Sequence, residues 1–403
     1  MKLLFLANEL PTQPLNGPRL KLFSILNYTG QRHQCDVIAF DNGDAERRVR
    51  ECERIAPGVR VLKVLPSNEG LRLVGRRLRR LVLDDKSPAI DSHYTAEGVT
   101  AVRVALDRGG YDAVHVDTFS MAAYIHHLPG LCSIMSVNDA ISLSFKRLAE
   151  TEAGAWKRRL FRMKAKRTEA TERALLPLFR VVHVVSGADA AYLSREICLT
   201  NLRVITLPAR AEWLIPTCEP NKSASTSPAF FTAGHLYRGF TWKPLARFLD
   251  EQWPTIIRRY PGATITLIGS NPPDQLRRAA SRVGVSLFEY VDNYAQLLQR
   301  ADIVFFLDQS GTGIKTRVIE AMANAKPLIV TESVLEGIGA CHGAECLVAN
   351  TPENAAAAAF QLLESPALMS SLGVRAQHFI RCRFTNETIG EQWERLYMEV
   401  ACD

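Results

Sequence analysis

This 403-residue sequence has no long apolar runs. The longest, such as Arg180–Ser186, are of strand length, whereas a membrane-spanning helix needs roughly 18 apolar residues. The opening segment MKLLFLANELPTQ lacks a small-residue cleavage site, so it predicts a first strand and not a signal peptide. No Cys-x-x-Cys pair occurs among the nine scattered cysteines, which favours reduced thiols in a cytosolic protein over metal or disulfide sites. We therefore predict a cytoplasmic protein.

Several nucleotide-binding and catalytic motifs are also missing. There is no G-x-x-x-x-G-K-[ST] loop and no G-x-G-x-x-G after the first strand, which disfavours a nucleoside triphosphatase and a dinucleotide oxidoreductase. No nucleophile elbow surrounds Ser186, which disfavours a serine hydrolase. The sequence contains no Asp-x-Asp signature, and we predict no metal site. Hydrophobic residues make up 47% and charged residues 23%, as in an ordinary globular protein long enough for two cores.

The net charge of +7 is concentrated locally. The stretch from Trp156 to Arg167 combines Trp, Leu, Phe and Met with seven cations, and it suits either a membrane surface or a charged helix face packed on the first domain. Peripheral attachment at the inner face of the membrane would fit a lipid-linked substrate. The sequence lacks the aromatic-interleaved pattern of a nucleic-acid-binding module, so we expect no nucleic-acid partner.

Apolar runs alternate with amphipathic stretches in the first half, which indicates a parallel sheet with helices on both faces. Helical patterns lie at Pro18–Thr29, Ala45–Ile55, Thr95–Arg108 and Phe119–His127, and a long charged helical region runs from about Ala140 to Phe179. The predicted strands are Lys2–Ala7, Cys35–Phe40, Val59–Leu65, Ala113–Asp117, Leu131–Ser136, Val181–Ser186 and Arg203–Leu207.

A proline-rich polar stretch separates the two halves, and we place a linker at residues 211–228. After it the alternation restarts. We predict two doubly wound, Rossmann-like α/β domains at residues 1–210 and 229–383, with a last helix at 384–403 that packs back on the first domain. Ligands of such sheets bind beyond the carboxyl ends of the strands. Two domains facing across a cleft suit a reaction between two substrates, and also some binding proteins.

One segment of the second half, from Asp308 to Thr331, carries the most chemistry. A strand ends in a polar loop whose glycines let backbone N–H groups approach an anion, and a helix is predicted from Gly313 to Ala325. Two cations add positive charge, and a carboxylate on the helix could accept hydrogen bonds from ribose hydroxyls. The segment suits a diphosphate-plus-ribose pocket, and equally an ordinary turn with solvated charges. The residues concerned are Gly311, Gly313, Lys315, Arg317 and Glu320.

The same segment, GTGIKTRVIEAMANAKPLIVT, resembles the nucleotide-sugar loop of family-four glycosyltransferases with the GT-B fold. These are retaining enzymes, and the similarity is to bacterial polysaccharide sugar transferases in particular. It extends from Ala229 to the end of the chain. Further matches are Phe231–Gly234, Tyr260–Gly269, Val291–Asp302 and Phe384-Thr385.

The resemblance implies roles for the second domain. Glu320 would hold the donor ribose, and one or both of Lys315 and Arg317 would face the diphosphate. Gly313 and Ile314 would supply backbone groups at the phosphate or the sugar. The other donor-site candidates are Asp292, Asn293 and Tyr294 near the base, His235 at a strand end, and the loosely matched pair Arg238 and Lys243.

In the first domain the resemblance is fainter and rests on Asn16–Arg19, which is similar to the family's first glycine loop. It implies that Gly17 and Arg19 close over the donor. Asp117 and Asp139 follow predicted strands where the family places acceptor and catalytic groups, and either could act as a base or as a positioning group. This domain would bind the acceptor.

The sequence departs from the family at two positions. Thr312 stands where many members have a glutamate, and Asn138 where many have a histidine. Thr312, counted among the donor-site candidates, implies an altered contact with the donor sugar. Because Asn138 replaces that histidine, an obvious polar partner of the donor sugar is missing. Both departures leave open a nucleotide-sugar-binding protein that has lost catalysis.

A mechanism follows from the resemblance. The enzyme would move a sugar from a UDP- or GDP-sugar to a glycan, lipid-linked or small-molecule acceptor, without a required cofactor or metal. Cations would stabilise the departing diphosphate. The catalytic candidates are thus Lys315 and Arg238 with Asp117 and Asp139. An alternative within enzymes is a nucleotide-sugar epimerase of similar architecture.

Overall fold

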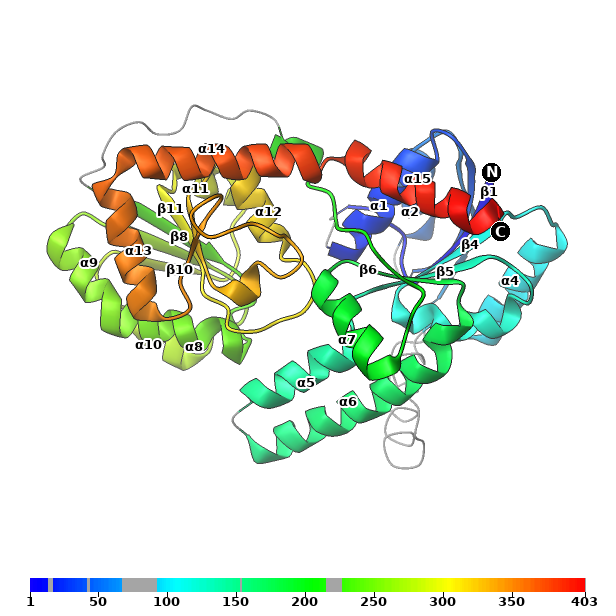
Figure 1. Cartoon of the computed structure of the whole chain (residues 1–403), viewed down its shortest axis with the longest axis horizontal. Helices are drawn as coiled ribbons and strands as arrows, with labels where there is room; N and C mark the ends of the chain where they lie inside the picture. The colour runs from blue at the N-terminus through cyan, green and yellow to red at the C-terminus, as the bar shows by residue number, and fades with distance from the viewer. Residues whose placement is uncertain (14–16, 42–43, 67–92, 153, 215–226, 403) are drawn as a thin grey trace. The chain divides into compact units, whose positions relative to one another are not determined.

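The computed structural model describes residues 1–13, 17–41, 44–66, 93–152, 154–214 and 227–402. The chain divides into two compact units (Figure 1). The first contains residues 1–149, 154–208 and those from Asn386 onward, and the second contains residues 209–385 with a short segment at 150–153. Asn16 of the expected glycine loop and positions 215–226 of the expected linker lie outside the described residues.

The sheet of the first unit is parallel throughout, with the strand order β3-β2-β1-β4-β5-β6-β7. Its strands follow the apolar runs of the sequence because both faces of the sheet are covered. The order reverses between β1 and β4, which makes this the switch point of the sheet. The strands are β1 (Lys2–Ala7), β2 (Gln34–Phe40), β3 (Val59–Leu65), β4 (Ala113–Asp117), β5 (Ser133–Asn138), β6 (Val181–Val184) and β7 (Leu202–Val204).

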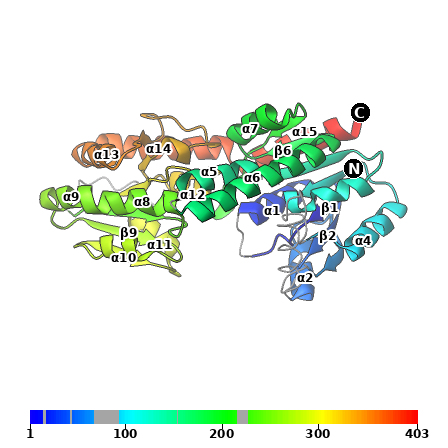
Figure 2. The ribbon, with the colours of Figure 1, turned by 90° about the horizontal axis from the view of Figure 1, so that it is seen from below.

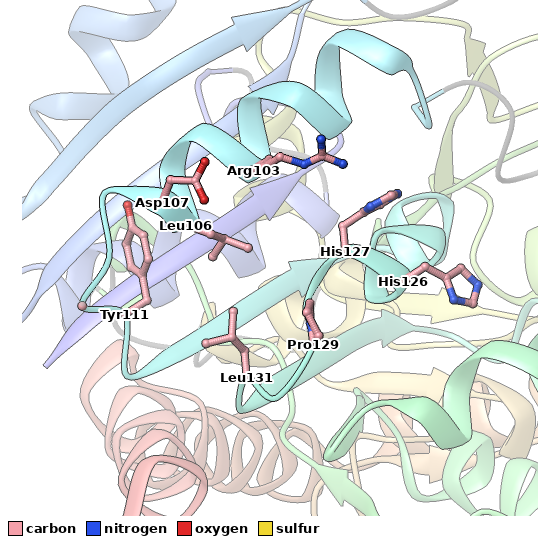
Figure 3. A pocket seen from close by; sticks show the side chains of 9 residues that line it. Arg103, Leu106, Asp107, Tyr111, His126, His127, Pro129 and Leu131 are labelled. Carbon is pink, nitrogen blue, oxygen red and sulfur yellow. The ribbon is translucent and has the colours of Figure 1, made fainter.

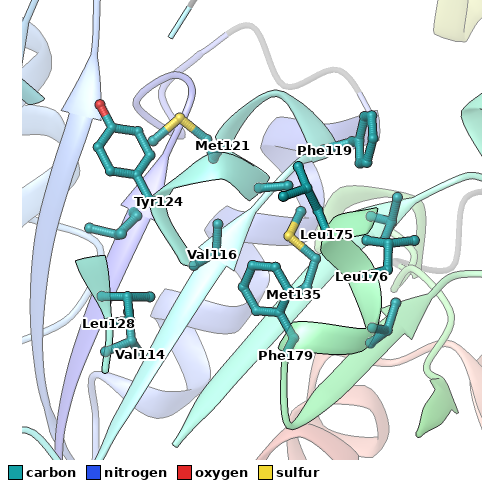
Figure 4. Close-up of a cluster of buried hydrophobic side chains, with 14 of the residues drawn as sticks. Val114, Val116, Phe119, Met121, Tyr124, Leu128, Met135, Leu175, Leu176 and Phe179 are labelled. Carbon is teal, nitrogen blue, oxygen red and sulfur yellow. The ribbon is translucent and has the colours of Figure 1, made fainter. Parts of the chain in front are cut away.

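Separate hydrophobic clusters occupy the two faces of this sheet. On one face, Val114, Val116 and Met135 of the strands belong to the same buried cluster as Leu175 and Phe179 (Figure 4). The helical segments of the unit are α1 (Gly17–Thr29), α2 (Ala45–Glu53), α4 (Ala96–Asp107), the 3₁₀ segments η2 (Phe119–His127) and η3 (Leu176–Leu178), α5 (Ile141–Thr151), α6 (Ala155–Leu175), α7 (Gly187–Ile197) and α15 (Asn386–Cys402).

Two of these segments differ from the sequence prediction. The stretch Phe119–His127 is 3₁₀-helical, and the long region predicted from Ala140 to Phe179 consists of α5, α6 and η3. Figure 2 shows α5 and α6 running side by side. The exposed end of α6 carries Trp156, whose side chain is 74% exposed.

The last helix of the chain, α15, packs against α1 in the first unit. Trp393 and Tyr397 of this helix are fully buried in the cluster on the second face of the sheet. The helices approach so closely that a Cβ added at Gly390 would lie 2.1 Å from the Tyr28 ring, so only glycine fits there. The first domain therefore includes α15, which follows the second unit in the sequence.

The second unit has a six-stranded parallel sheet in the order β10-β9-β8-β11-β12-β13. Its switch point lies between β8 and β11. The strands are β8 (Ala229–Ala233), β9 (Thr264–Ile268), β10 (Val285–Phe288), β11 (Ile303–Phe306), β12 (Leu328–Val330) and β13 (Leu347–Val348). The predicted fold class, α/β with two doubly wound sheets, is confirmed.

Helices cover the second sheet on both faces, where two further hydrophobic clusters lie. The helical region that follows β8 begins at Gly239 and contains a π-helical stretch. The helical segments are η4 (Ala211–Leu214), α8 (Gly239–Arg247), η5 (Phe248–Gln252), α9 (Trp253–Arg259), α10 (Asp274–Ala279), α11 (Tyr294–Arg300), α12 (Thr316–Ala323), η6 (Glu332–Val334), α13 (Pro352–Glu364) and α14 (Pro366–Arg383).

Candidate active site

Polar residues gather at the switch point of the second sheet, where β8 and β11 end. Gly234 and His235 follow β8, and Asp308 comes two residues after the end of β11. This edge is where doubly wound sheets bind their ligands, because the connections to the next helices diverge there. The elements that follow β11 are the glycine loop and α12, the segment that the sequence singled out.

Asp308 is hydrogen-bonded to several residues at this edge of the sheet. The sequence analysis assigned it no role. Its carboxylate is 5% exposed and accepts hydrogen bonds from Arg317 Nη2 at 2.5 Å and from Thr241 Oγ1 at 2.6 Å. Its carbonyl oxygen accepts hydrogen bonds from the hydroxyls of Thr331 and Ser333. The only signal in the sequence was an acidic residue directly after a buried strand.

Arg317 is held in place by its ion pair with Asp308. Its guanidinium carbon lies 5.1 Å from the Phe306 ring centroid, and a Cβ added at Gly234 would lie 3.1 Å from its Nη1 atom. Within the described part of the chain, its buried Nε atom has no hydrogen-bond partner. Arg317 is thus a rigidly placed cation at the switch point, with one donor group unused.

The helix after the glycine loop begins at Thr316, three residues later than predicted. Gly311 and Gly313 have φ values of 138° and 64°, which residues with side chains rarely adopt, so they keep the loop out of the helix. Lys315 is the N-cap residue of α12, and its Nζ atom lies 3.3 Å from the Gly313 carbonyl oxygen. The lysine therefore lies over the loop. Thr312 and Ile314 belong to the same loop and are half-buried.

Glu320 lies one turn further along α12 and is half-buried. Desolvation raises the pKa of its carboxyl to about 7, against a smaller opposing effect of the Arg210 cation. Burial, and then the Glu320 charge, raise the pKa of Tyr294, whose ring lies 5.5 Å from that of Phe231. Glu320 and Tyr294 therefore share one environment at the carboxyl end of β8.

The remaining donor-site candidates divide into two groups. Desolvation and the nearby cations Arg238 and Arg317 lower the pKa of His235, so these three residues lie together. Asp292, Asn293 and Lys243, in contrast, have exposed side chains on the loop before α11 and on α8.

The first unit has its own polar cluster at the carboxyl ends of β4 and β5. Lys21 of α1 is buried, and its Nζ atom lies 2.6 Å from the Asp117 carboxylate and 2.5 Å from both Ser136 Oγ and Asn138 Oδ1. Burial alone would raise the pKa of Asp117, but Lys21 and His115 outweigh it and hold that pKa below its usual value. Sequence reasoning missed Lys21, whose signal was a lone cation within the apolar stretch LKLFSIL.

The other first-domain candidates lie near this edge of the sheet. Gly17 begins α1, and Arg19 of the same helix forms an ion pair with Glu9, at 2.7 Å, just after β1. Asp139 follows β5 and is half-buried. Arg19 is thus held at the switch point of the first sheet.

A pocket of about 500 Å³ lies elsewhere in the first unit (Figure 3). Tyr111 and Leu131, which line it, precede β4 and β5, and Leu106 and His127 come from the ends of α4 and η2. The pocket is therefore at the amino ends of the strands, the opposite edge from the Lys21 cluster, and it does not belong to the candidate site.

Within the described ranges, no group of three or more His, Cys, Asp or Glu side chains is arranged to hold a metal ion. No helix within those ranges has the length and apolar character needed to cross a membrane.

The C-terminal half matches a known family. Residues 227–365 fit the family described as glycosyl transferases group 1. This segment includes the switch point, the glycine loop and α12. It is a glycosyl transferases group 1 domain, which confirms the resemblance found in the sequence. No curated protein matches the chain.

Solved structures with the same fold cover nearly the whole chain. Sucrose-phosphate synthase from Thermosynechococcus elongatus is 16% identical over 99% of both chains, with a TM-score of 0.71. Anabaena HepE in complex with UDP-glucose is 15% identical over 99% of this chain and all of that one, with a TM-score of 0.64. A point mutant of S. aureus TarM, in complex with fondaparinux, alpha-GlcNAc-glycerol and UDP, is 10% identical over 98% of this chain and all of that one, with a TM-score of 0.63.

These proteins share the GT-B fold, and the chain therefore has the fold expected from the sequence. The family match of residues 227–365 confirms the predicted enzyme class, a glycosyltransferase.

Proposed function

We propose that the protein is a retaining glycosyltransferase that moves a sugar from a UDP-sugar to a glycan, lipid-linked or small-molecule acceptor. The observation that carries the proposal is the arrangement of Lys315, Arg317 and Glu320 around the glycine loop at the switch point of the second sheet. Cations beside a glycine loop suit a diphosphate, and a carboxylate behind them suits the ribose. Uridine is supported by HepE and TarM, whose structures contain UDP.

In the proposed reaction, the bond between the anomeric carbon and the β-phosphate oxygen breaks. The acceptor oxygen forms its bond to the same face of the sugar, and the acceptor proton passes to the departing phosphate. Lys315 stabilises the negative charge that develops on UDP, with Arg238 as a second cation. Asp117 is buried and ion-paired with Lys21, so we assign it a positioning role and leave Asp139 as the acidic group nearer the acceptor.

Thermal shift with a panel of nucleotides tests the donor site, because a ligand that binds the folded state raises the apparent stability. We expect UDP to raise the melting temperature of the wild type, and Glu320→Ala to abolish the shift. Glu364→Ala, an exposed glutamate at the end of α13, serves as the matched control. An equal UDP shift in Glu320→Ala would remove Glu320 from the site.

Product analysis separates the alternatives. A transferase consumes UDP-sugar and forms a glycosylated acceptor, whereas an epimerase isomerises the donor without an acceptor. A binding protein that has lost catalysis, which Thr312 and Asn138 left open, binds UDP but turns over no donor with any acceptor.

The exposed end of α6 supports peripheral contact with an anionic membrane. Trp156 is 74% exposed, and Arg159, Arg162 and Lys166 are exposed on the same helix. An indole beside several cations suits the boundary between head groups and acyl chains. Co-sedimentation with phosphatidylglycerol vesicles tests this: Trp156→Ala should weaken binding, and phosphatidylcholine vesicles should bind neither protein.

A further inference from the structure

The pocket at the amino edge of the first sheet has no part in the proposed transfer (Figure 3). Its volume of about 500 Å³ is typical of small-molecule sites in proteins. β4 has five residues, so at about 3.3 Å per residue the pocket lies roughly 16 Å from the carboxyl edge, where Lys21 and Asp117 meet. A single sugar unit cannot reach both edges, so a ligand in the pocket is separate from one at the carboxyl edge.

One end of the pocket carries groups that attract an anion. Figure 3 shows Arg103 of α4 and His127 of η2 close together at this end. Burial, and then the Arg103 and His126 charges, lower the pKa of His127, so the three groups interact. Among the described residues, none of the three is ion-paired with a carboxylate. Positive groups without a counter-charge favour an anionic ligand.

The opposite end of the pocket suits hydroxyl groups. It carries Asp107 and Tyr111, and Leu106 and Leu131 lie between the two ends (Figure 3). A carboxylate accepts hydrogen bonds from hydroxyls, and leucine and tyrosine side chains pack against the C–H groups of a sugar ring. The Lys2 ammonium lies 4.5 Å from the Tyr111 ring centroid, which disfavours a ligand ammonium group at this end.

Two side chains of the pocket are held in place by their own partners. The Tyr111 hydroxyl donates to Asp36 Oδ2 at 2.7 Å, and Asp36 also accepts two hydrogen bonds from Arg60 at 2.9 Å. His127 Nε2 lies 2.8 Å from the Tyr94 hydroxyl, and the two rings are stacked with their centroids 6.0 Å apart. Because these side chains are already ordered, a ligand loses less free energy in ordering them.

We propose that this pocket binds an anionic saccharide, a sugar unit that carries a carboxylate or a phosphate group. The anionic group contacts Arg103 and His127, and the sugar hydroxyls donate to Asp107. The ring packs between these ends on Leu106 and Tyr111. Two sources share this chemistry, an acidic unit of a glycan chain and a free sugar phosphate. The inference goes beyond the proposed function, because it adds a second saccharide site at the opposite edge of the sheet.

Calorimetric titration of the full chain with four probes tests the ligand class. Methyl glucuronide represents an acidic unit within a chain, since its anomeric oxygen is blocked, and glucose 1-phosphate represents a free sugar phosphate. We expect at least one of the two to bind, and the tighter one identifies the source. Glucose and inorganic phosphate should each bind about tenfold more weakly, because each lacks one of the two sets of contacts.

Three outcomes of these titrations would overturn the proposal. Glucose that binds as tightly as the anionic sugars would exclude the contact of the anion with Arg103 and His127. Inorganic phosphate that binds as tightly would exclude the contacts of the sugar ring. Absence of binding by both anionic sugars would exclude the site.

Variants locate the bound sugar. Arg103→Met should weaken binding of the tighter anionic sugar about tenfold, because it removes a charged hydrogen-bond donor. Arg50→Met is the matched control, since Arg50 is an exposed arginine of α2 outside the pocket, and it should leave the affinity unchanged. Glu320→Ala should also bind as the wild type does. Unchanged affinity in Arg103→Met would overturn the proposal, and loss of binding in Glu320→Ala would place the sugar in the second unit.

The pH dependence of glucuronide binding tests the contact with His127. The titratable and charged groups around this histidine are Arg103, Asp107, His126, Tyr94 and Tyr111. Carboxylates and guanidinium groups ordinarily keep their charges between pH 6 and pH 8, whereas histidine takes up a proton. The affinity should therefore rise as the pH falls from 8 to 6, and His127→Gln should reduce this rise. An equal rise in the variant would overturn the His127 contact.

Discussion

Asp308 and Arg317 form an ion pair at the switch point of the second sheet, with Oδ2 and Nη2 2.5 Å apart. The carboxylate is 5% exposed and the guanidinium side chain 17% exposed. This pairing distinguishes the two cations of the glycine segment, which looked equivalent in the sequence. Arg317 has a protein carboxylate as its partner, whereas Lys315 lies over the glycine loop.

The first prediction concerns stability. Arg317→Met leaves Asp308 buried without its cation and should lower the free energy of unfolding by about 3–5 kcal/mol. Arg317→Met/Asp308→Asn should recover most of that loss, because no uncompensated charge remains. Urea unfolding measures both variants. Similar losses in the single and double variants would show that the arginine contributes mainly through packing on Phe306.

The second prediction concerns turnover. Lys315→Met should lower the rate of UDP-sugar turnover roughly 10²- to 10³-fold, because it removes a charge that stabilises the departing diphosphate. Lys326→Met is the matched control. Lys326 lies just before β12, and its Nζ atom donates to the Gln299 and Ala301 carbonyl oxygens just before β11. Initial rates at saturating donor measure the effect. A rate equal to that of the control would exclude Lys315 from the site.

The third prediction concerns the pH dependence of UDP binding. Desolvation raises the pKa of Glu320 to about 7, so its carboxyl is mostly protonated at pH 6 and ionised at pH 8. Hydrogen bonds from ribose hydroxyls favour the ionised form. UDP should therefore bind about tenfold more weakly at pH 6 than at pH 8, from this group alone.

Calorimetric titration of Glu320→Gln supplies the control, because it retains the titration of UDP itself. The difference between wild type and variant reports Glu320. If both proteins show the same pH dependence, the carboxylate does not contact the nucleotide.

The fourth prediction concerns the pH dependence of folding. Burial raises the pKa of Glu172 from 4.5 to about 7, although its carboxylate accepts hydrogen bonds from Ser142. The folded state then holds a proton that the unfolded state releases, so this group's contribution to stability falls as the pH rises from about 5 to 8. The loss should be on the order of 3 kcal/mol.

Glu172→Gln should abolish that loss and keep the hydrogen bond to Ser142 N. Two buried histidines of the same unit, His115 and His183, have lowered pKa values and act in the opposite direction at acidic pH. Comparing wild type and variant at each pH cancels their effect. Parallel stability curves would show that Glu172 is ionised throughout.

The sequence predicts the strands well because most of them are buried on both faces, and this makes them continuous apolar runs such as Lys2–Ala7 and Ile303–Phe306. It predicts the start of α12 poorly. Lys315 is not a usual N-cap residue and its side chain forms no cap hydrogen bond, so no local signal marks that end.

The residues of the candidate site also divide into those that the sequence could predict and those that it could not. The glycine loop and Glu320 could be predicted because they lie within one short segment. Lys21 and Asp308 could not, because each depends on a partner brought near by the fold: Asp117 on β4 for the lysine, and Thr241 on α8 for the aspartate. The sequence alone does not show whether the fold brings an opposite charge next to a charged residue.

The placement of α15 has a consequence for biosynthesis. The ribosome makes the strands of the first sheet early, but Trp393 and Tyr397, which cover one of its faces, are made only after the whole of the second unit. The amino-terminal domain therefore cannot complete its folding until the second domain has been translated, and until then it exposes apolar surface. A truncated transcript that lacks the last helix should yield a chain that chaperones retain.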